Sequence, residues 1–486
     1  MKKHLKLFAL LPLFCGLLLN FACSRDDDDS LPRDPNVDIP GANDLLNTPW
    51  SELAPAQHKA RLEQQSINFL NEMNALSNLS AIDAVENLSR LFDIDFPDIP
   101  DPFTEVEIRD GWREIFNLDN VTGIFTWNNQ QRRWTETNSN SELRFVFPAT
   151  QGATTNNATL AVRTENSGRT FTESWEDCWC EEWNWETWEC IERICEDYEI
   201  VWHLPRAATA TLTVDGSQAA RIEFGAEYNR NDMPQRAIYR MTTTEGYELS
   251  WAVNTRREDV ITMSLRRNNN SLLEAVARTD MDLAAWEDLG LDALDGEDID
   301  PETMFNLLKE ATASIKLMND LTIVYWIDSE NFAREMDALS SWSNGEWDKI
   351  WEWNDQEWQR IENSDVCDWN SPNHNWQTCN ALHNQRWRTV DSLEVLRMNE
   401  VTRREVNIMN EFMRSALVST DENFRIAEVV ATAEQRWTTW SGFQEVRPII
   451  WLRFNNNVRI EAEVYFGSGF DALINRWEDF VNSFDR

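Results

Sequence analysis

Apolar and polar residues alternate one by one through much of the region between residues 119 and 280. In residues 208–214, alanine, leucine and valine alternate with threonine, and residues 221–228 show the same alternation. Asp215 and Gly216 stand between these segments and are typical of a two-residue hairpin turn. A strand that buries only one face has this period, so the region predicts an antiparallel meander with one apolar face that needs a cover.

Apolar residues at helical spacing predict the helices that cover this face. These helices are expected at 52–77, 81–93, 300–318 and 470–484. The third begins with a proline and two acids, which suit a helix start, and its buried side is expected to contain Met304, Leu308, Ala311, Ile315 and Met318. For 321–327, the periodicity fits either an extension of this helix or a strand. Further strands are predicted at 424–434, 444–454 and 457–466, which completes an α+β fold with an antiparallel sheet backed by helices.

The first residues have the composition of an export signal. Three lysines precede an apolar run from Leu7 to Leu19, which is too short to span a bilayer as a helix. The run ends at Ala22 and Cys23, which predicts removal of the signal peptide and acylation of Cys23. An ordinary cleaved signal peptide, with an incidental cysteine, is the alternative.

Four aspartates, Asp26–Asp29, follow Cys23 almost directly. An acidic run at this place resembles the surface-export signal of Bacteroidota lipoproteins, which implies an outer-membrane lipoprotein exposed at the cell surface. The alternative is a charged tether that keeps the linker solvated.

The chain carries a formal net charge of −40, with 84 acidic residues against 44 lysines and arginines. Such a chain repels phosphate backbones, so nucleic acid is excluded as a general partner. Solubility at high salt is the simplest interpretation of this acidity, and we prefer it to acid-based chemistry.

The length allows two or more domains, and the predicted organisation has three parts. They are a signal peptide at 1–23, a disordered tether at 24–49 and an ectodomain at 50–486. Within the ectodomain we expect a helical start at 50–118, the sheet at 119–280, a mainly helical part at 281–420, and strands with a final helix at 421–486.

Six cysteines follow Cys23, and an even number in an exported protein predicts disulfides. Four lie within 178–195, where the nested pairs Cys178–Cys195 and Cys180–Cys190 suit the register of a hairpin. Cys367 and Cys379 form the third expected pair. Zinc is the alternative for the first group, but its spacing lacks the usual Cys-x2-Cys pairs.

Five short motifs stand out in the strand-forming parts of the chain: Gly123–Trp127, Phe145–Pro148, Asn157–Leu160, Leu212–Gly216 and Glu463–Phe466. Together they resemble segments of uncharacterised surface lipoproteins of Bacteroidota. The similar portion covers about 119–280 and 424–484, roughly half of the chain. The resemblance implies an α+β lipoprotein, and no catalytic residue is implied with it.

Two insertions relative to these segments are rich in tryptophan. Residues 172–203 and 342–387 hold fourteen of the 25 tryptophans and all six expected disulfide cysteines. Indole rings stack on the C–H faces of sugars, so a glycan site is one hypothesis; its candidate residues are Trp183, Trp185, Trp188, Trp351, Trp353 and Trp358. The alternatives are indoles that pack on one another as a small core, and a surface for a protein partner.

No catalytic motif is recognisable, and the four histidines after the signal peptide are not spaced as metal ligands. We therefore expect no enzyme, no cofactor and no metal. The predicted function is a non-enzymatic binding or structural role at the cell surface, with extracellular glycan as the best ligand hypothesis. A carrier of lipid or another hydrophobic ligand on the concave sheet face is the alternative, and a glycoside hydrolase is a third hypothesis.

Overall fold

A computed structural model describes residues 32–35, 37–95, 122–139, 142–184, 189–229, 234–255, 259–281, 308–438 and 442–467. Its helices are α2 Ala42–Leu46, α3 Pro55–Ser77, α4 Ser80–Ile94, α8 Ser329–Glu362 and α9 Trp376–Phe412, with a 3-10 turn, η4, at Asn455–Asn457. Its strands are β1 Gly123–Asn128, β2 Arg133–Thr137, β3 Leu143–Phe147, β4 Ala158–Asn184, β5 Glu189–Val214, β6 Ser217–Tyr228, β7 Pro234–Thr243, β8 Tyr247–Asn254, β9 Asp259–Arg267, β10 Asn270–Met281, β11 Leu308–Leu317, β12 Leu321–Asp328, β13 Met413–Ser419, β14 Phe424–Thr438, β15 Gln444–Arg453 and β16 Arg459–Glu461.

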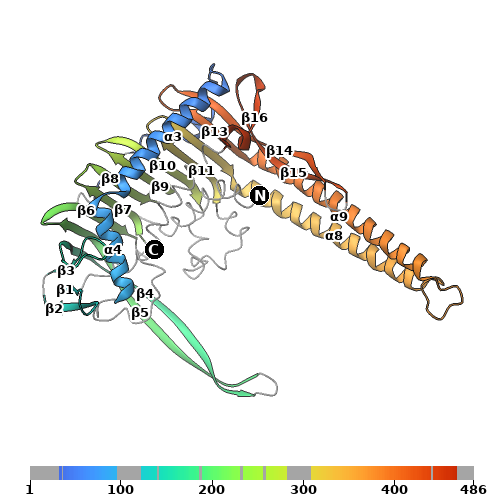
Figure 1. Cartoon of the computed structure of the whole chain (residues 1–486), viewed down its shortest axis with the longest axis horizontal. Helices are drawn as coiled ribbons and strands as arrows, with labels where there is room; N and C mark the ends of the chain where they lie inside the picture. Colours follow the sequence, from blue (N-terminus) through green and yellow to red (C-terminus); the bar gives the residue numbers. More distant parts are fainter. Residues whose placement is uncertain are drawn as a thin grey trace.

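All these strands form one sheet that follows chain order almost throughout, as the predicted meander requires (Figure 1). Neighbouring strands are antiparallel, except that β1 pairs with β3 in parallel. The predicted turn joins β5 to β6, where Asp215 and Gly216 have φ of 51° and 79°. Positive φ at both central residues belongs to the turn that matches strand twist, which is why Asp-Gly suits this position.

Helices cover the two faces of the sheet at different places. Leu321 of β12 lies in one apolar cluster with Leu62 of α3. Val324, three residues along the same strand, lies in another cluster with Leu45 of α2. Because successive side chains on a strand point to opposite faces, α3 and α2 lie on opposite faces of the sheet.

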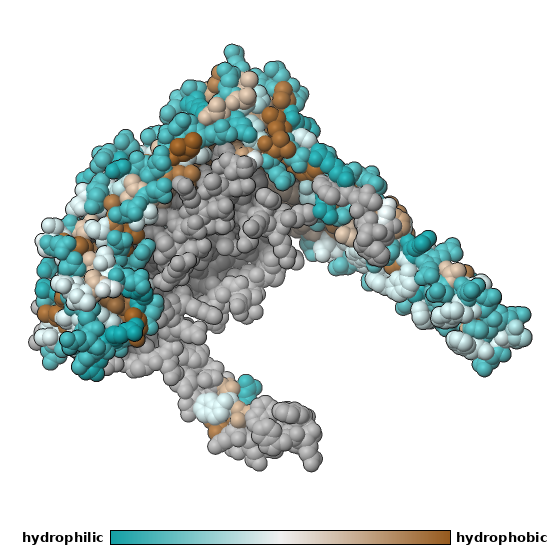
Figure 2. All heavy atoms as spheres, viewed as in Figure 1, coloured by the Kyte–Doolittle hydropathy of each residue, from teal (hydrophilic) through white to brown (hydrophobic). Residues whose placement is uncertain are grey.

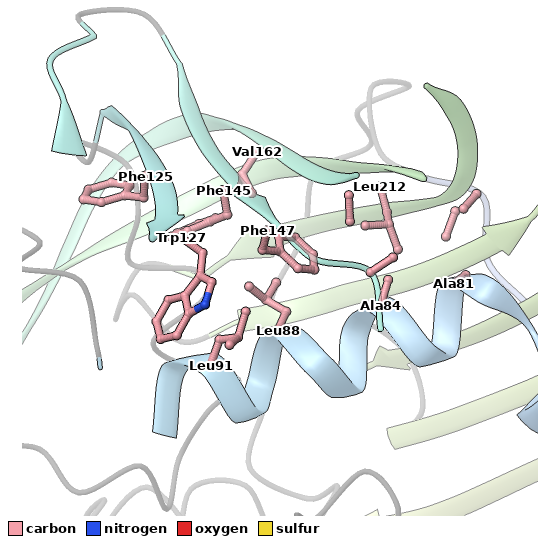
Figure 3. Packing of buried hydrophobic residues seen from close by; sticks show 14 of the residues in the cluster. Ala81, Ala84, Leu88, Leu91, Phe125, Trp127, Phe145, Phe147, Val162 and Leu212 are labelled. Carbon is pink, nitrogen blue, oxygen red and sulfur yellow. The ribbon is translucent and has the colours of Figure 1, made fainter. Parts of the chain in front are cut away.

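The largest apolar cluster lies under α4, at the end of the sheet formed by β1 to β6 (Figure 3). Leu88 and Leu91 of α4 point toward Trp127 and Phe147 of the strands. Trp127 is only 4% exposed, and its ring lies 5.4 Å from that of Trp134 in an edge contact. Here tryptophan is a core residue, because a helix is available to cover the sheet.

The segment before α3 is held on the sheet by a buried ion pair. The carboxylate of Glu274, 1% exposed, lies 2.6 Å from Arg266 and 3.6 Å from Lys316. It also accepts a hydrogen bond from the backbone N–H of Asp38, and Lys316 donates one to the Asp38 carbonyl. Residues 37–49 of the predicted disordered tether therefore pack on the sheet. The Asp38 backbone forms hydrogen bonds with the buried charged groups of Glu274 and Lys316.

The helix predicted at 300–318 is wrong in its described part. β11 runs from Leu308 to Leu317 and pairs with β10 and β12 on either side. Ala311, Ala313, Ile315 and Leu317 alternate with polar residues, a two-residue period that competes with the helical spacing in the same segment. Hydrogen bonds to β10 and β12 satisfy the backbone N–H and C=O groups on both edges of this segment, which favours the strand over the helix. The undecided segment 321–327 is likewise a strand, β12.

Two long hairpins extend beyond the sheet (Figure 1). The first, the strand arm, comprises residues 171–203 of β4 and β5, which pair only with each other. The second, the helical arm, comprises α8, α9 and the loop between them. All three disulfides pair as predicted and lie on these arms: Cys178–Cys195 and Cys180–Cys190 on the first, and Cys367–Cys379 on the second. Each of the two Trp-rich segments, 172–203 and 342–387, therefore projects from the sheet and contains its own disulfide bonds.

Candidate functional site

The outer end of the helical arm carries the most exposed tryptophans among the described residues. Trp369 is 75% exposed and Trp376 is 61% exposed. Their ring centroids are 6.2 Å apart with an interplanar angle of 30°. The ring of His374 stacks on Trp369 at 4.3 Å. We refer to Trp369, His374 and Trp376 as the tip cluster.

The loop that holds Trp369 and His374, residues 363–375, is built by local hydrogen bonds and leads into Trp376, the first residue of α9. The N–H groups of Cys367 and Asp368 donate to the Ser364 carbonyl, and that of Asn375 donates to Val366. The Asn375 side chain then accepts from Thr378 N–H and caps the start of α9. These bonds and the disulfide fix the backbone beneath the indoles.

A small core beneath the loop excludes the two exposed indoles. It consists of Ile361, Cys367 and Cys379, with Val366 and Leu382 packed against them. Ile361 is fully buried. The tip therefore has its own core without Trp369 or Trp376, so the expectation that the indoles serve as that core fails for this pair.

The predicted residues Trp351, Trp353 and Trp358 lie along α8 and do not form one surface. Seven residues make about two helical turns, so Trp351 and Trp358 share a side, whereas two residues rotate Trp353 by about 200°. Trp353 is half-buried, and Trp351 is 45% exposed with no ring or cation contact among the described residues. Trp358 stacks on the Arg386 guanidinium at 4.4 Å and lies 4.9 Å from the His383 ring. Trp358 is 44% exposed despite these contacts, so Trp351 and Trp358 are both accessible but do not stack on each other.

The predicted residues of the strand arm are only partly described. Trp183 belongs to β4, where its backbone lies opposite Cys190. Trp185 and Trp188 lie outside the described residues, as does Cys23. Trp179 lies between the two disulfide cysteines of β4 and is exposed. The strand arm thus also presents an indole between covalent cross-links.

Arginine covers the tryptophan at the base of the helical arm. The guanidinium groups of Arg397 and Arg404 lie 4.5 Å and 3.7 Å from the Trp342 ring. Glu346 forms ion pairs with Arg397 and Lys349, and hydrogen bonding from Lys349 is the main cause that lowers the Glu346 pKa. A shallow cavity of about 530 Å³ lies here between α8 and α9. Most of its charged groups are paired: Glu346 with Arg397 and Lys349, and Glu400 with Arg404, whereas Arg403 forms no ion pair among the described residues. Unlike the tip, the cavity exposes no stacked indole pair.

Cys367, Cys379 and His383 place their potential ligand atoms within 4.8 Å of one another. Both sulfurs are joined in a disulfide, so neither is the thiolate that a metal would need. His383 instead lies 3.2 Å from the Glu362 carboxylate. We interpret this group as structural support for the tip rather than as a metal centre.

Sequence reasoning missed Trp369 and Trp376 as the candidate pair. A usable signal was present. Both tryptophans lie between Cys367 and Cys379, twelve positions apart, among asparagine, serine and proline rather than apolar residues. An indole in such surroundings has few neighbours that could bury it.

The three disulfides indicate an extracytoplasmic protein. None of the helices in the described ranges is both long and apolar enough to cross a bilayer. Comparison of the chain with family models, curated proteins and solved structures found no match.

Proposed function

We propose that this chain is a surface-anchored lipoprotein that binds an extracellular glycan through the tip cluster of its helical arm. Anchoring rests on the N-terminal signal and Cys23, and export agrees with the disulfides. In this proposal the sheet is a scaffold, and the arms carry the binding side chains away from it.

The observation that carries the proposal is the exposed, stacked pair Trp369 and Trp376 at the tip of the helical arm, which has a core without them. Exposing two indoles leaves a large apolar area in water, which a stable fold ordinarily avoids. Sugar rings present C–H faces that fit an indole, and their hydroxyls suit nearby carboxylate and amide groups. Asp368, Asn370 and Asn373 are exposed around the pair and supply such groups.

The position of the tip favours binding over hydrolysis. Glycoside hydrolysis needs two carboxyl groups placed on either side of the bond, in a site that controls water. Trp369 lies on the projecting loop and Trp376 at the start of α9, both with most of their surface in solvent. Such a surface can retain a polymer, but it offers no enclosed place for a reacting bond.

The test uses residues 24–486, secreted behind an ordinary cleavable signal peptide, so that Cys23 and its lipid are absent and the disulfides form. We would measure retention on cellulose, chitin, xylan, mannan and starch, and the shift in tryptophan emission with soluble fragments. Trp369→Ala combined with Trp376→Ala is expected to reduce retention at least tenfold, while Trp351→Ala serves as the matched control for loss of an exposed indole. Equal retention by the double variant, or no retention of any polymer, would contradict the proposal.

The carrier hypothesis remains a separate prediction. It expects lipid to copurify with the secreted chain, and extraction followed by mass spectrometry would detect it. A protein without bound lipid would count against a carrier and leave the glycan proposal unaffected.

A further inference from the structure

The outer part of the helical arm has no free positive charge. Residues 361–385 contain neither lysine nor arginine. Of the arginines that flank this segment, Arg360 forms an ion pair with Glu357 at 2.6 Å. Arg386 is 3% exposed and lies between the rings of Trp358 and Trp387, at 4.4 Å and 4.7 Å. Neither can reach a ligand seated on the tip cluster without losing these contacts.

Negative charge, in contrast, lies beside the exposed indoles. Asp368 directly precedes Trp369, and Asp365 lies in the same loop. Both are exposed, and no ion pair to a cation is formed by either among the described residues. The Asp368 carboxylate is oriented by the backbone N–H of Asn370, which donates to it at 2.8 Å. A ligand that stacks on Trp369 therefore meets at least one uncompensated carboxylate.

Nearer the sheet, the same arm carries charges of both signs. Lys349, Arg397 and Arg403 line the cavity between α8 and α9 together with Glu346 and Glu400. Residues 361–385 differ from this cavity, because they include acids but no lysine or arginine. The most exposed indoles of the described residues lie in this acidic segment.

From this distribution we infer that the tip cluster selects uncharged glycans and rejects polyanionic ones, such as uronate or sulfate polymers. The inference rests on the proposed function and names its ligand class. Charges are screened over about 8 Å at physiological salt, so Asp365 and Asp368 matter more than the −40 charge of the whole chain. An anionic sugar on Trp369 would approach them closely with no cation nearby to compensate.

Matched polymers with one backbone test this selectivity. Hydroxyethylcellulose and carboxymethylcellulose form one pair, and dextran and dextran sulfate form another. We expect the uncharged member of a pair to bind at least tenfold more tightly than the anionic member at low salt. The ratio should shrink as salt is raised, because screening weakens the repulsion.

Removing the carboxylate charges of Asp365 and Asp368 tests whether they cause the discrimination against anionic polymers. Asp365→Asn with Asp368→Asn should strengthen binding of the anionic member by roughly fivefold at low salt and leave the uncharged member unchanged. Asparagine can still accept the Asn370 N–H bond, so the loop keeps its hydrogen bonding. Asp348→Asn with Asp355→Asn removes the same charge from exposed positions nearer the sheet on α8 and should change neither polymer.

The outcomes separate the two proposals. Equal or tighter binding of the anionic polymer, or an equal response to the control variant, would overturn the charge selectivity while glycan binding stands. Failure of every polymer of both kinds to bind would overturn the proposed function, and the selectivity would fall with it. Polycationic polymers are unsuitable probes, because the acidic chain attracts them wherever they land.

Discussion

Tryptophan has opposite environments in the sheet and at the tip of the helical arm. Trp127 lies under α4, enclosed by leucine and phenylalanine side chains (Figure 3). Trp369 lies on a loop whose core is already complete with Ile361 and the Cys367–Cys379 disulfide. Strongly hydrophobic residues in Figure 2 occur mainly over the sheet region and only sparsely along the helical arm. The comparison shows that burial of an indole depends on whether a second element is available to cover it.

The largest expected effect comes from the sheet tryptophan. Trp127→Ala should lower the free energy of unfolding by about 4 kcal/mol, because it opens a large cavity under α4 that the surrounding helix and strands cannot fully close. Chemical denaturation followed by circular dichroism measures this. A loss below about 1 kcal/mol would show that the cluster is not a true core, and Trp127 and Trp369 would then not differ in their contribution to stability.

Removal of the tip disulfide should have a smaller and local effect. Replacing Cys367 and Cys379 with alanine should cost about 2–3 kcal/mol of local stability, because the open loop gains conformational freedom. Hydrogen exchange should accelerate in residues 363–382 and stay unchanged in β8 to β10. Faster exchange spread over the sheet would mean that the arm and the scaffold are one cooperative unit.

Alkaline pH should affect the sheet before it affects the tip. Burial, then the hydrogen bond that Tyr247 donates to Glu72, raises the pKa of Tyr247 to about 12. Its folded pKa lies above the ordinary value of about 10, so its contribution is fully present below pH 10 and is lost as pH rises toward 12. We expect Tyr247 to contribute about 1 kcal/mol of the loss by pH 11. Burial also raises the pKa of Tyr228, Tyr239 and Tyr465, so Tyr247→Phe should remove only its own share of the loss. An unchanged profile would contradict the assignment.

The smallest expected effect on stability belongs to the tip. Trp369→Ala with Trp376→Ala should change the free energy of unfolding by less than about 0.5 kcal/mol, because neither indole belongs to a core. The same variant should lose glycan retention. Destabilisation close to that of Trp127→Ala would show that the pair is structural, and it would remove the basis of the proposed site.

The disulfides illustrate what a local pattern can predict. Cys178 and Cys195 lie directly opposite each other in the β4–β5 ladder, so hairpin register predicts this pair. Cys180 lies opposite Arg193 and Cys190 opposite Trp183, and register shifts between them accompany the inner pair. A local pattern also predicts the turn at Asp215 and Gly216, where backbone conformation follows from the two residue types. These features depend on neighbours in sequence, so they could be predicted.

The segment 308–317 illustrates the opposite case. Its apolar residues fit helical spacing and strand alternation at once, and β10 and β12 as partners decided between them. Likewise, polar surroundings in the sequence set Trp369 and Trp376 apart, but only the fold shows that the guanidinium of Arg386 contacts Trp358 and Trp387.

The sequence by itself determined the antiparallel meander and the disulfide pairing, because strand period and hairpin register act locally. Only the tertiary structure decided which tryptophans are buried, covered by arginine or free. Exposure depends on which distant elements pack together, and a linear pattern does not contain that information. The same holds for the cations of the helical arm, whose ion pairs and stacking contacts leave the tip with acids alone.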